Sequence, residues 1–252
     1  MTNVMRYAMA GLFFCAGFFA SRSEATVVIG GTRVVYPAKE KEVTVKLTNQ
    51  GAQPALVQVW LDDGDAKSTP TTAKVPFEVL PPFFRLDQGR GQAVRVIYTK
   101  EPLAADRETL FWINVLEVPP KSAEGGKNLL EFAFRTRIKL FFRPSGLAGT
   151  VNGAPDKLVW KLVNGEGGKG VALQVTNPTP YYVNFAQVGL KIGQRSVIQD
   201  ERAAKGGMVA PGGSTTFQLD GLTSRPTAEV KAQFEVISDF GAVNRMLQPL
   251  TP

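Results

Sequence analysis

Residues 128–144, Asn-Leu-Leu-Glu-Phe-Ala-Phe-Arg-Thr-Arg-Ile-Lys-Leu-Phe-Phe-Arg-Pro, decide the fold of this chain. The large apolar residues of this stretch fall on even positions, at Leu130, Phe132, Phe134, Ile138, Leu140 and Phe142. Mostly charged residues stand between them, which gives the period of two that is typical of a β-strand. We expect one strand of about fifteen residues, where ordinary strands have about five or six. Arg143 and Pro144 should end it, because proline cannot donate a hydrogen bond to a ladder.

The rest of the chain repeats the β pattern in shorter segments that turn residues separate. In the first half we expect strands at residues 27–29, 32–37, 43–48, 56–61, 77–82, 84–86, 93–98 and 110–118. In the second half we expect them at residues 158–163, 170–176, 182–190, 215–219 and 229–237. Short strands at this spacing are typical of immunoglobulin-like sandwiches. We therefore predict an all-β protein of two such domains, residues 26–144 and 145–252, joined at an elbow.

The first 25 residues have the pattern of a secretory signal peptide. Arg6 supplies positive charge, residues 8–20 form the apolar core, and Ser23-Glu24-Ala25 is a small-x-small cleavage site. The apolar run is short for a membrane span of about twenty residues, so we expect no stable membrane insertion, with a single-pass anchor as the alternative. The single cysteine, Cys15, lies in this segment. Cleavage after Ala25 would leave a mature chain without disulfides that depends on core burial.

The charge balance indicates what kind of partner the protein has. The chain carries 29 basic and 22 acidic residues, a formal net charge of +7. Without Arg6, Arg22 and Glu24 of the leader, 27 basic and 21 acidic residues remain, a balance of +6. This excess suits an anionic surface or an acidic partner, or it is only a solvated lysine-rich surface. Export and the absence of an aromatic–basic motif argue against a nucleic-acid partner.

The sequence offers little for catalysis or metal binding. It has no histidine, which removes histidine triads, histidine metal sites and the commonest general base. Its serines form neither a Gly-x-Ser-x-Gly elbow nor a Ser-x-x-Lys pair. The turn Asp62-Asp63-Gly64-Asp65 does not have the spacing of a helical calcium-binding loop, so we interpret it as an acidic, solvated turn. We expect no enzyme, no cofactor and no metal site.

Two basic residues stand among apolar neighbours. Arg33 follows the pair Gly30-Gly31 in the first strands, and Lys139 lies near the end of the long strand. Their stems could simply lie along apolar surface while their charged ends reach water. Alternatively, the two could converge between the domains and bind a carboxylate through charge-assisted hydrogen bonds. Residue chemistry alone leaves both interpretations open.

Three blocks resemble one known family. Residues Asp106–Pro120, Thr136–Pro144 and Asn177–Val183 are similar to the signatures of periplasmic pilus-assembly chaperones of the chaperone–usher pathway, the PapD-like family. The resemblance covers essentially the whole mature chain. It implies two immunoglobulin-like domains in an L shape, a location in the periplasm, a one-to-one complex with a pilin or fimbrial subunit, and delivery of that subunit to an outer-membrane usher. Self-association of the client-free protein stays open, as does the identity of the pilin.

The resemblance also implies roles for individual residues. Arg33 and Lys139 match the cleft pair that anchors the C-terminal carboxylate of the client. The even-numbered residues at the start of the long strand match the donor residues that fill the groove of an incomplete pilin; these are Leu130, Phe132 and Phe134. Three charged residues match a network that bridges the domains and fixes the elbow; these are Glu108, Arg143 and Asp239.

Two departures and one conflict accompany the resemblance. Many relatives have a disulfide in the second domain, which this chain lacks, and the segment from Pro120 to Leu130 has the length of the short-loop subclass. In an uninterrupted strand, Lys139 faces away from the three donor residues, so we expect either a bulge or a client that approaches the strand edge-on. The rival interpretation is a secreted two-domain adhesion or carbohydrate-binding protein, which would display exposed aromatic residues and need no basic pair.

Overall fold

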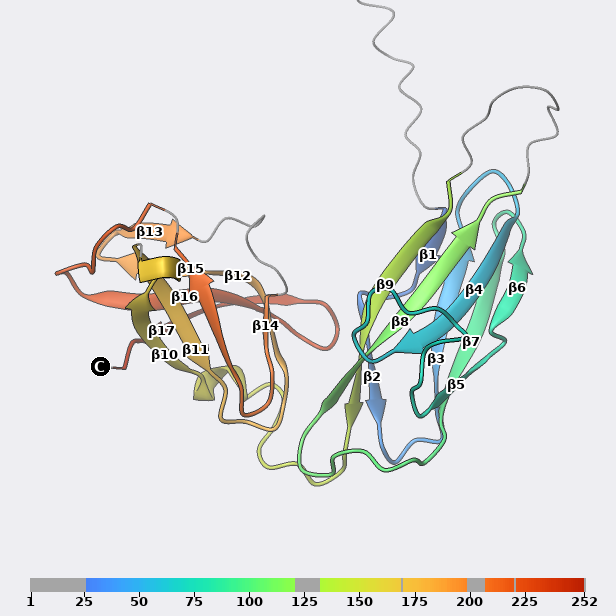
Figure 1. Ribbon diagram of the computed structural model, residues 1–252, viewed down its shortest axis with the longest axis horizontal. Coiled ribbons are helices and arrows are strands. Elements are labelled where there is room, and N and C mark those ends of the chain that lie inside the picture. Colours follow the sequence, from blue (N-terminus) through green and yellow to red (C-terminus); the bar gives the residue numbers. More distant parts are fainter. Residues whose placement is uncertain (1–25, 121–131, 169, 199–206, 220, 252) are drawn as a thin grey trace, which may run out of the picture.

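The computed structural model describes residues 26–120, 132–168, 170–198, 207–219 and 221–251, which form two β-sandwiches placed at an angle to each other (Figure 1). The only helical segments in these ranges are two short 3-10 turns, η2 (Pro155–Lys157) and η3 (Glu166–Gly168). None of the described helices is long and apolar enough to cross a membrane. The predicted class, all-β with two immunoglobulin-like sandwiches, is confirmed.

The first sandwich packs a four-stranded sheet against a five-stranded sheet. The four-stranded sheet has the order β1 (Val27–Ile29), β3 (Glu42–Asn49), β7 (Gly91–Tyr98) and β5 (Phe77–Leu80). The five-stranded sheet has the order β2 (Arg33–Pro37), β9 (Phe134–Arg143), β8 (Thr109–Val118), β4 (Ala55–Asp62) and β6 (Phe83–Leu86). The pairing of β2 with β9 is parallel and the other pairings are antiparallel.

The second sandwich has the same two-sheet architecture. One sheet has the order β10 (Val159–Asn164), β11 (Val171–Thr176) and β15 (Ser214–Gln218). The other has the order β13 (Arg195–Ile198), β12 (Val183–Ile192), β16 (Val230–Ile237) and β17 (Val243–Pro249), and β14 (Met208–Val209) pairs with β12. The sequence pattern did not predict β13, β14 or β17. Val197 in β13 and Val209 in β14 are buried, but the three strands show little alternation of apolar and polar residues. Most residues of β17 are exposed.

Each sandwich has its own core, built from one face of each sheet. In β8, Phe111, Ile113 and Val115 are buried, and in β9, Ile138, Leu140 and Phe142 are buried opposite them. The second core surrounds Trp160 and Phe234, whose ring centroids lie 4.7 Å apart. These side chains remove apolar surface from water in a chain whose described residues contain no cysteine.

The chain changes sheets at the glycine pair Gly30-Gly31. Ile29 pairs with Leu47 in the four-stranded sheet, whereas Arg33 pairs with Lys139 in the five-stranded sheet. At the crossing the Gly30 amide donates to the Lys46 carbonyl over 2.8 Å. A Cβ atom on Gly30 would lie only 3.3 Å from that carbonyl oxygen, so a residue without a side chain suits the crossing. This change of sheet places Arg33 beside Lys139.

The long strand is shorter than the sequence pattern predicted. It begins at Phe134, and the preceding described residues Phe132 and Ala133 lie outside any strand. Its partner explains the limit, because β8 ends at Val118 and Pro119-Pro120 follows, where no amide can donate to the ladder. Leu130, and with it the loop that suggested the short-loop subclass, lies outside the described residues.

The register of β9 decides how Lys139 faces relative to Phe134, the one expected donor residue within this strand. Phe134–Phe142 pairs with β8 residue by residue, and Lys139–Arg143 pairs with β2 in the same way, so this part of the strand has no bulge. Phe134 therefore faces the core side and Lys139 the outer side. Since β2 reaches only as far as Lys139, β9 has no neighbour beyond β8 over residues 134–138, within the described chain. This segment is an open sheet edge.

Candidate functional site: a cationic cleft beside an open strand edge

Arg33 and Lys139 lie side by side on parallel strands at the junction of the two sandwiches. They are register partners on β2 and β9, so their side chains leave the sheet on the same face. In the described part of the chain, neither of them forms an ion pair with a carboxylate. Like charges placed directly opposite on neighbouring strands repel each other. The fold thus keeps two cations adjacent to each other although they repel.

Both cations are partly removed from water. Burial, together with the neighbouring Arg33, lowers the pKa of Lys139 to about 8. Burial also lowers the pKa of Arg33, and the charge of Asp239 opposes this. The Arg33 Nε atom is buried and has no hydrogen-bond partner. An unpaired buried donor beside a desolvated ammonium is suited to bind an anion.

The second sandwich supplies the polar contacts that orient this pair. The Lys139 ammonium donates to Asn184 Oδ1 over 2.7 Å, and Arg33 Nη1 donates to the Ile237 carbonyl over 3.2 Å. Asn184 lies on β12 and is buried, and Ile237 ends β16. Sequence reasoning did not find Asn184. The one feature of the sequence that could have indicated Asn184 is its position. It is a polar residue directly after the block Asn177–Val183, at the otherwise apolar start of a strand.

The structure brings Glu108, Arg143 and Asp239 together at the elbow. Arg143 Nε donates to Glu108 Oε1 over 2.5 Å, and its two terminal nitrogens donate to the Asp239 carboxylate over 2.7 and 3.1 Å. Glu108 is 3% exposed and also accepts the Tyr182 amide over 2.7 Å. Burial works against the charged form of Arg143, but hydrogen bonds to Asp239 and attraction to Glu108 outweigh it, so the pKa of Arg143 is raised.

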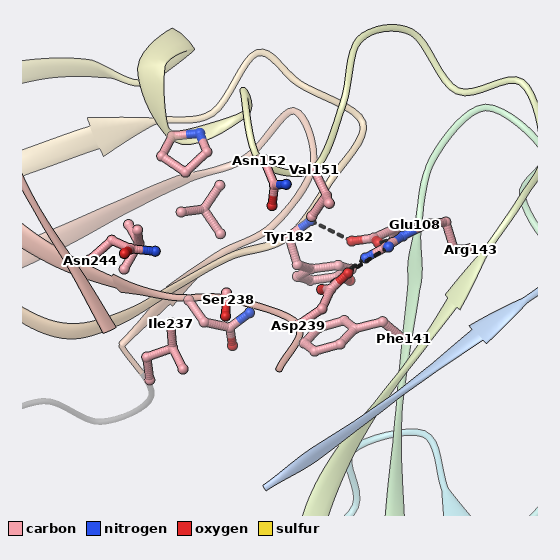
Figure 2. Close-up of a pocket in the computed structure, with 14 residues that line it drawn as sticks. Glu108, Phe141, Arg143, Val151, Asn152, Tyr182, Ile237, Ser238, Asp239 and Asn244 are labelled. Atoms are coloured by element: carbon pink, nitrogen blue, oxygen red, sulfur yellow. Dashed lines mark hydrogen bonds and ion pairs between the residues drawn. The ribbon is translucent and has the colours of Figure 1, made fainter. Parts of the chain in front are cut away.

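Figure 2 shows how this network spans the junction. Glu108 and Arg143 come from the first sandwich, whereas Tyr182 and Asp239 come from the second. The Phe141 and Tyr182 rings pack across the same junction with centroids 5.5 Å apart. A pocket opens here, lined on the side of the second sandwich by Ser238 and Asn244. These contacts tie the ends of β9 and β16 together.

Of the expected donor residues, Phe134 begins β9, Phe132 lies just before the strand, and Leu130 lies outside the described residues. Phe134 is half-buried and pairs with Glu117 of β8, on the face that carries the core. Phe132 precedes the strand and is 53% exposed. Phe134 therefore extends the row of core-facing side chains of β9, Ile138, Leu140 and Phe142, towards the start of the strand. No bulge is required for Lys139 to face the other way.

A buried charge cluster holds the outer face of β9. Asp62 was predicted to be solvated, but that prediction is wrong for this residue, which is 1% exposed. It accepts hydrogen bonds from Arg137 over 2.6 Å and from Asn114 over 2.6 Å, because it faces the basic positions of β9 across β8. The Arg135 and Arg137 guanidinium groups also lie over the rings of Trp60 and Trp112, at 4.7 and 4.8 Å. These contacts fix the outer face of the strand.

The described residues contain no group of three or more His, Cys, Asp or Glu side chains able to hold a metal ion. The site is therefore best defined by what its groups can bind. An open strand edge, an apolar side chain at its exposed end and two cations at its other end that form no ion pair within the described residues suit an extended peptide with a terminal carboxylate. Fold and site together define a class of two-sandwich protein whose open edge and cations are suited to a peptide strand.

Comparison with known proteins gives this class its family. Residues 26–148 match the family of the pili and flagellar-assembly chaperone PapD N-terminal domain, and residues 153–248 match the pili assembly chaperone PapD C-terminal domain. The probable fimbrial chaperone YadV of Escherichia coli K12 is 43% identical over 240 residues, which cover 94% of each chain. The chain belongs to the PapD-like family of pilus-assembly chaperones, and its function is that of a chaperone in the chaperone–usher pathway.

Solved structures agree with this assignment. The crystal structure of the YadV chaperone has a TM-score of 0.76 at 41% identity and covers 90% of this chain and 100% of that one. The SafB chaperone, solved in complex with the SafA pilin of Salmonella enterica, has a TM-score of 0.73 at 29% identity, with 91% and 99% covered. The periplasmic chaperone SfaE has a TM-score of 0.63 at 29% identity, with 88% and 98% covered. The family is one of chaperones and is not known for enzymatic activity.

Proposed function

We propose that this chaperone is exported to the periplasm by its first 25 residues and binds a pilin subunit there by strand addition, with Arg33 and Lys139 as the anchor for the C-terminal carboxylate of the pilin. The bound subunit is protected from premature polymerisation and passes to the outer-membrane usher. The observation that carries the proposal is the pairing of Arg33 with Lys139 on parallel strands, where neither forms an ion pair with a described carboxylate.

The carboxylate anchor follows from the charges of the cleft. Two adjacent, partly desolvated cations repel each other, and an incoming carboxylate would relieve the repulsion and accept hydrogen bonds from both. Asn184 holds the Lys139 ammonium, and the Ile237 carbonyl holds the Arg33 guanidinium, so both donors are oriented before a client arrives. Preorganisation of this kind lowers the entropy cost of binding.

Strand addition follows from the open edge of β9. Unpaired backbone groups over residues 134–138 can form a ladder with a client strand, while donor side chains enter the groove of the client. Burial of Leu130, Phe132 and Phe134 would supply on the order of 5–9 kcal/mol before entropy costs, at about 1.5–3 kcal/mol for each side chain. Occupation of the groove would hide a hydrophobic edge of the client that otherwise aggregates.

The anchor and the donor residues together would set the register of the client. A slip of one residue turns every side chain of a strand to the opposite face, so one fixed end determines the whole alignment. The fixed end here is the carboxylate between Arg33 and Lys139. The ion pairs of Arg143 with Glu108 and Asp239 support this role, because they hold the second sandwich, and with it Asn184, against the cleft.

Co-expression with a pilin subunit tests the proposal. The wild-type chaperone should be recovered from the periplasm as a one-to-one complex, and a pilin with an amidated or extended C-terminus should bind more weakly. A pilin that binds equally well with a blocked carboxylate would contradict the anchor. An adhesion or carbohydrate-binding protein, the rival interpretation, would instead retain glycan and no pilin.

A further inference from the structure

Glu117 is a carboxylate on a core-facing position. Along β8, the odd-numbered residues Phe111, Ile113 and Val115 are buried in the core of the first sandwich, and Glu117 continues this row. It is 5% exposed. A buried charge is tolerated only when it is paired or well hydrogen-bonded, so the partners of Glu117 need an explanation.

Among the described residues, the hydrogen bonds that Glu117 accepts come from Thr26, which precedes β1, and from Val27, which begins it. The Thr26 backbone nitrogen lies 2.9 and 3.2 Å from the two carboxylate oxygens, and the Val27 amide donates over 2.9 Å. The Thr26 hydroxyl also donates to this carboxylate. In the part of the chain that the structure describes, no lysine or arginine forms an ion pair with Glu117.

Thr26 is closely packed between Glu117 of β8 and the turn at Gln50 and Gly51. Its carbonyl accepts the Gln50 amide over 2.8 Å. Gly51 packs against its side chain so closely that a Cβ atom on Gly51 would lie 2.5 Å from the Cβ of Thr26. Thr26 is also the first residue after the predicted leader cleavage site.

We propose that Glu117, with Gly51, forms a receptor site for the mature N-terminus, so that cleavage of the leader creates a buried ion pair. Hydrolysis of the bond between Ala25 and Thr26 by a leader peptidase adds one water molecule. The hydroxyl goes to the Ala25 carbonyl carbon, and the proton goes to the Thr26 nitrogen. That nitrogen takes a second proton from solvent and becomes an ammonium, since a free α-amino group has a pKa near 8. This inference rests on the leader assignment in the proposed function.

The position of the pair links processing to client binding. Glu117 is the register partner of Phe134, the first residue of β9. An ammonium paired with Glu117 therefore secures the end of the sandwich from which the donor segment departs. A chain that retains its leader has a neutral amide at this point and lacks the ion pair.

A comparison of two N-termini and two side chains tests the proposal. One protein begins at Thr26, released from a fusion without extra residues, and the other retains Ala25 in front of it. Each is made with Glu117 and with Glu117→Gln, and Glu78→Gln, an exposed position in the same sandwich, is the control. Thermal unfolding is measured for all of them, and the intact mass of the exported wild-type protein is determined.

The ion pair predicts a specific pattern. Retention of Ala25 should lower the Tm by about 3–8 °C, and Glu117→Gln should lower the Tm of the Thr26 protein clearly more than that of the extended protein. Glu78→Gln should have no effect. Equal Tm values for the two N-termini would overturn the inference and leave the pilin-binding proposal intact. An exported protein whose mass shows a different first residue would overturn the leader assignment as well.

Discussion

Arg33 and Lys139 are register partners on adjacent parallel strands, and neither forms an ion pair with a carboxylate of the described residues. Folding alone does not favour this arrangement, because each charge disfavours the other and both are partly desolvated. The proposed binding of a client carboxylate would explain why the fold keeps them together. The pair should therefore contribute to binding while it costs stability in the free protein.

Removal of either cation should strongly weaken client binding without unfolding the chaperone. Arg33→Ala or Lys139→Ala removes one side of a charge-assisted contact, at a cost of about 2–5 kcal/mol, or a roughly 30-fold or larger loss of affinity for pilin. Urea unfolding should show an unchanged or higher free energy of unfolding. Lys161→Ala, which removes an exposed lysine of β10, is the control for charge. Normal recovery of pilin with both cleft variants would refute the anchor.

Client affinity should fall as the pH rises above about 8, the pKa of Lys139 in the free protein. A bound carboxylate raises the pKa of Lys139, so both states are protonated below pH 8 and the affinity is level there. Above pH 8 the free protein loses the proton first, and the affinity falls by up to about tenfold per pH unit. Titration calorimetry with pilin at pH values from about 6 to about 10 measures the affinity. An affinity that does not change with pH would contradict the prediction.

The stability of the free chaperone should change with pH in the opposite sense. Unfolded Lys139 has an ordinary pKa near 10.5, so between pH 8 and 10.5 the unfolded chain binds more protons than the folded one. The free energy of unfolding contributed by this group therefore rises with pH across that window. Lys139→Met should remove this contribution. If the rise is the same in wild type and variant, another group causes it.

Arg143→Ala should be among the most destabilising single substitutions at the elbow. It leaves Glu108, with a side chain 1% exposed, without its cation, which costs about 3–5 kcal/mol. Small-angle scattering should also show a wider range of angles between the sandwiches. Arg245→Ala is the control, because this arginine is 68% exposed in its ion pair with Glu235 and should matter by less than about 1 kcal/mol. Equal losses for both variants would contradict a structural role of the elbow network.

Phe132→Glu should prevent complex formation while the free protein keeps its stability. Phe132 is 53% exposed in the free protein and has no place in the core, so the substitution costs little there. In a complex the same position would carry a charge into the groove of the client. Leu247→Glu changes a similarly exposed residue, 49%, on the second sandwich and should leave pilin capture normal. Retained binding by Phe132→Glu would exclude this residue from the donor segment.

The sequence predicted elements where one face of a strand is buried, and it failed where burial does not alternate. β8 and β9 were identified from their alternating residues, whereas β17 is largely exposed and carries no such signal. The length of β9 was overestimated because alternation continues to Leu130, although the partner strand ends at Val118. The partner strand decides where a strand ends, and the local sequence pattern carries no information about that partner.

Predictions for the site show the same limit. Resemblance to the family singled out Arg33 and Lys139, and the change of sheet at Gly30-Gly31 brings them together. Asn184 was missed because its contact with Lys139 depends on the packing of two sandwiches. Asp62 was misassigned because a turn-like sequence gave no sign that Arg137 covers it. A single sequence does not indicate which distant segments come into contact.

Amide hydrogen exchange over residues 132–138 is the most direct test of strand capture by this chaperone. Residues 134–138 form the edge of β9 that has no second neighbour in the described part of the free protein, and residues 132 and 133 directly precede this edge. With pilin bound, their exchange should slow by about tenfold or more, because new ladder hydrogen bonds protect the amides. Unchanged exchange at this edge, together with protection at the exposed edge strand β17, would show that the client binds elsewhere.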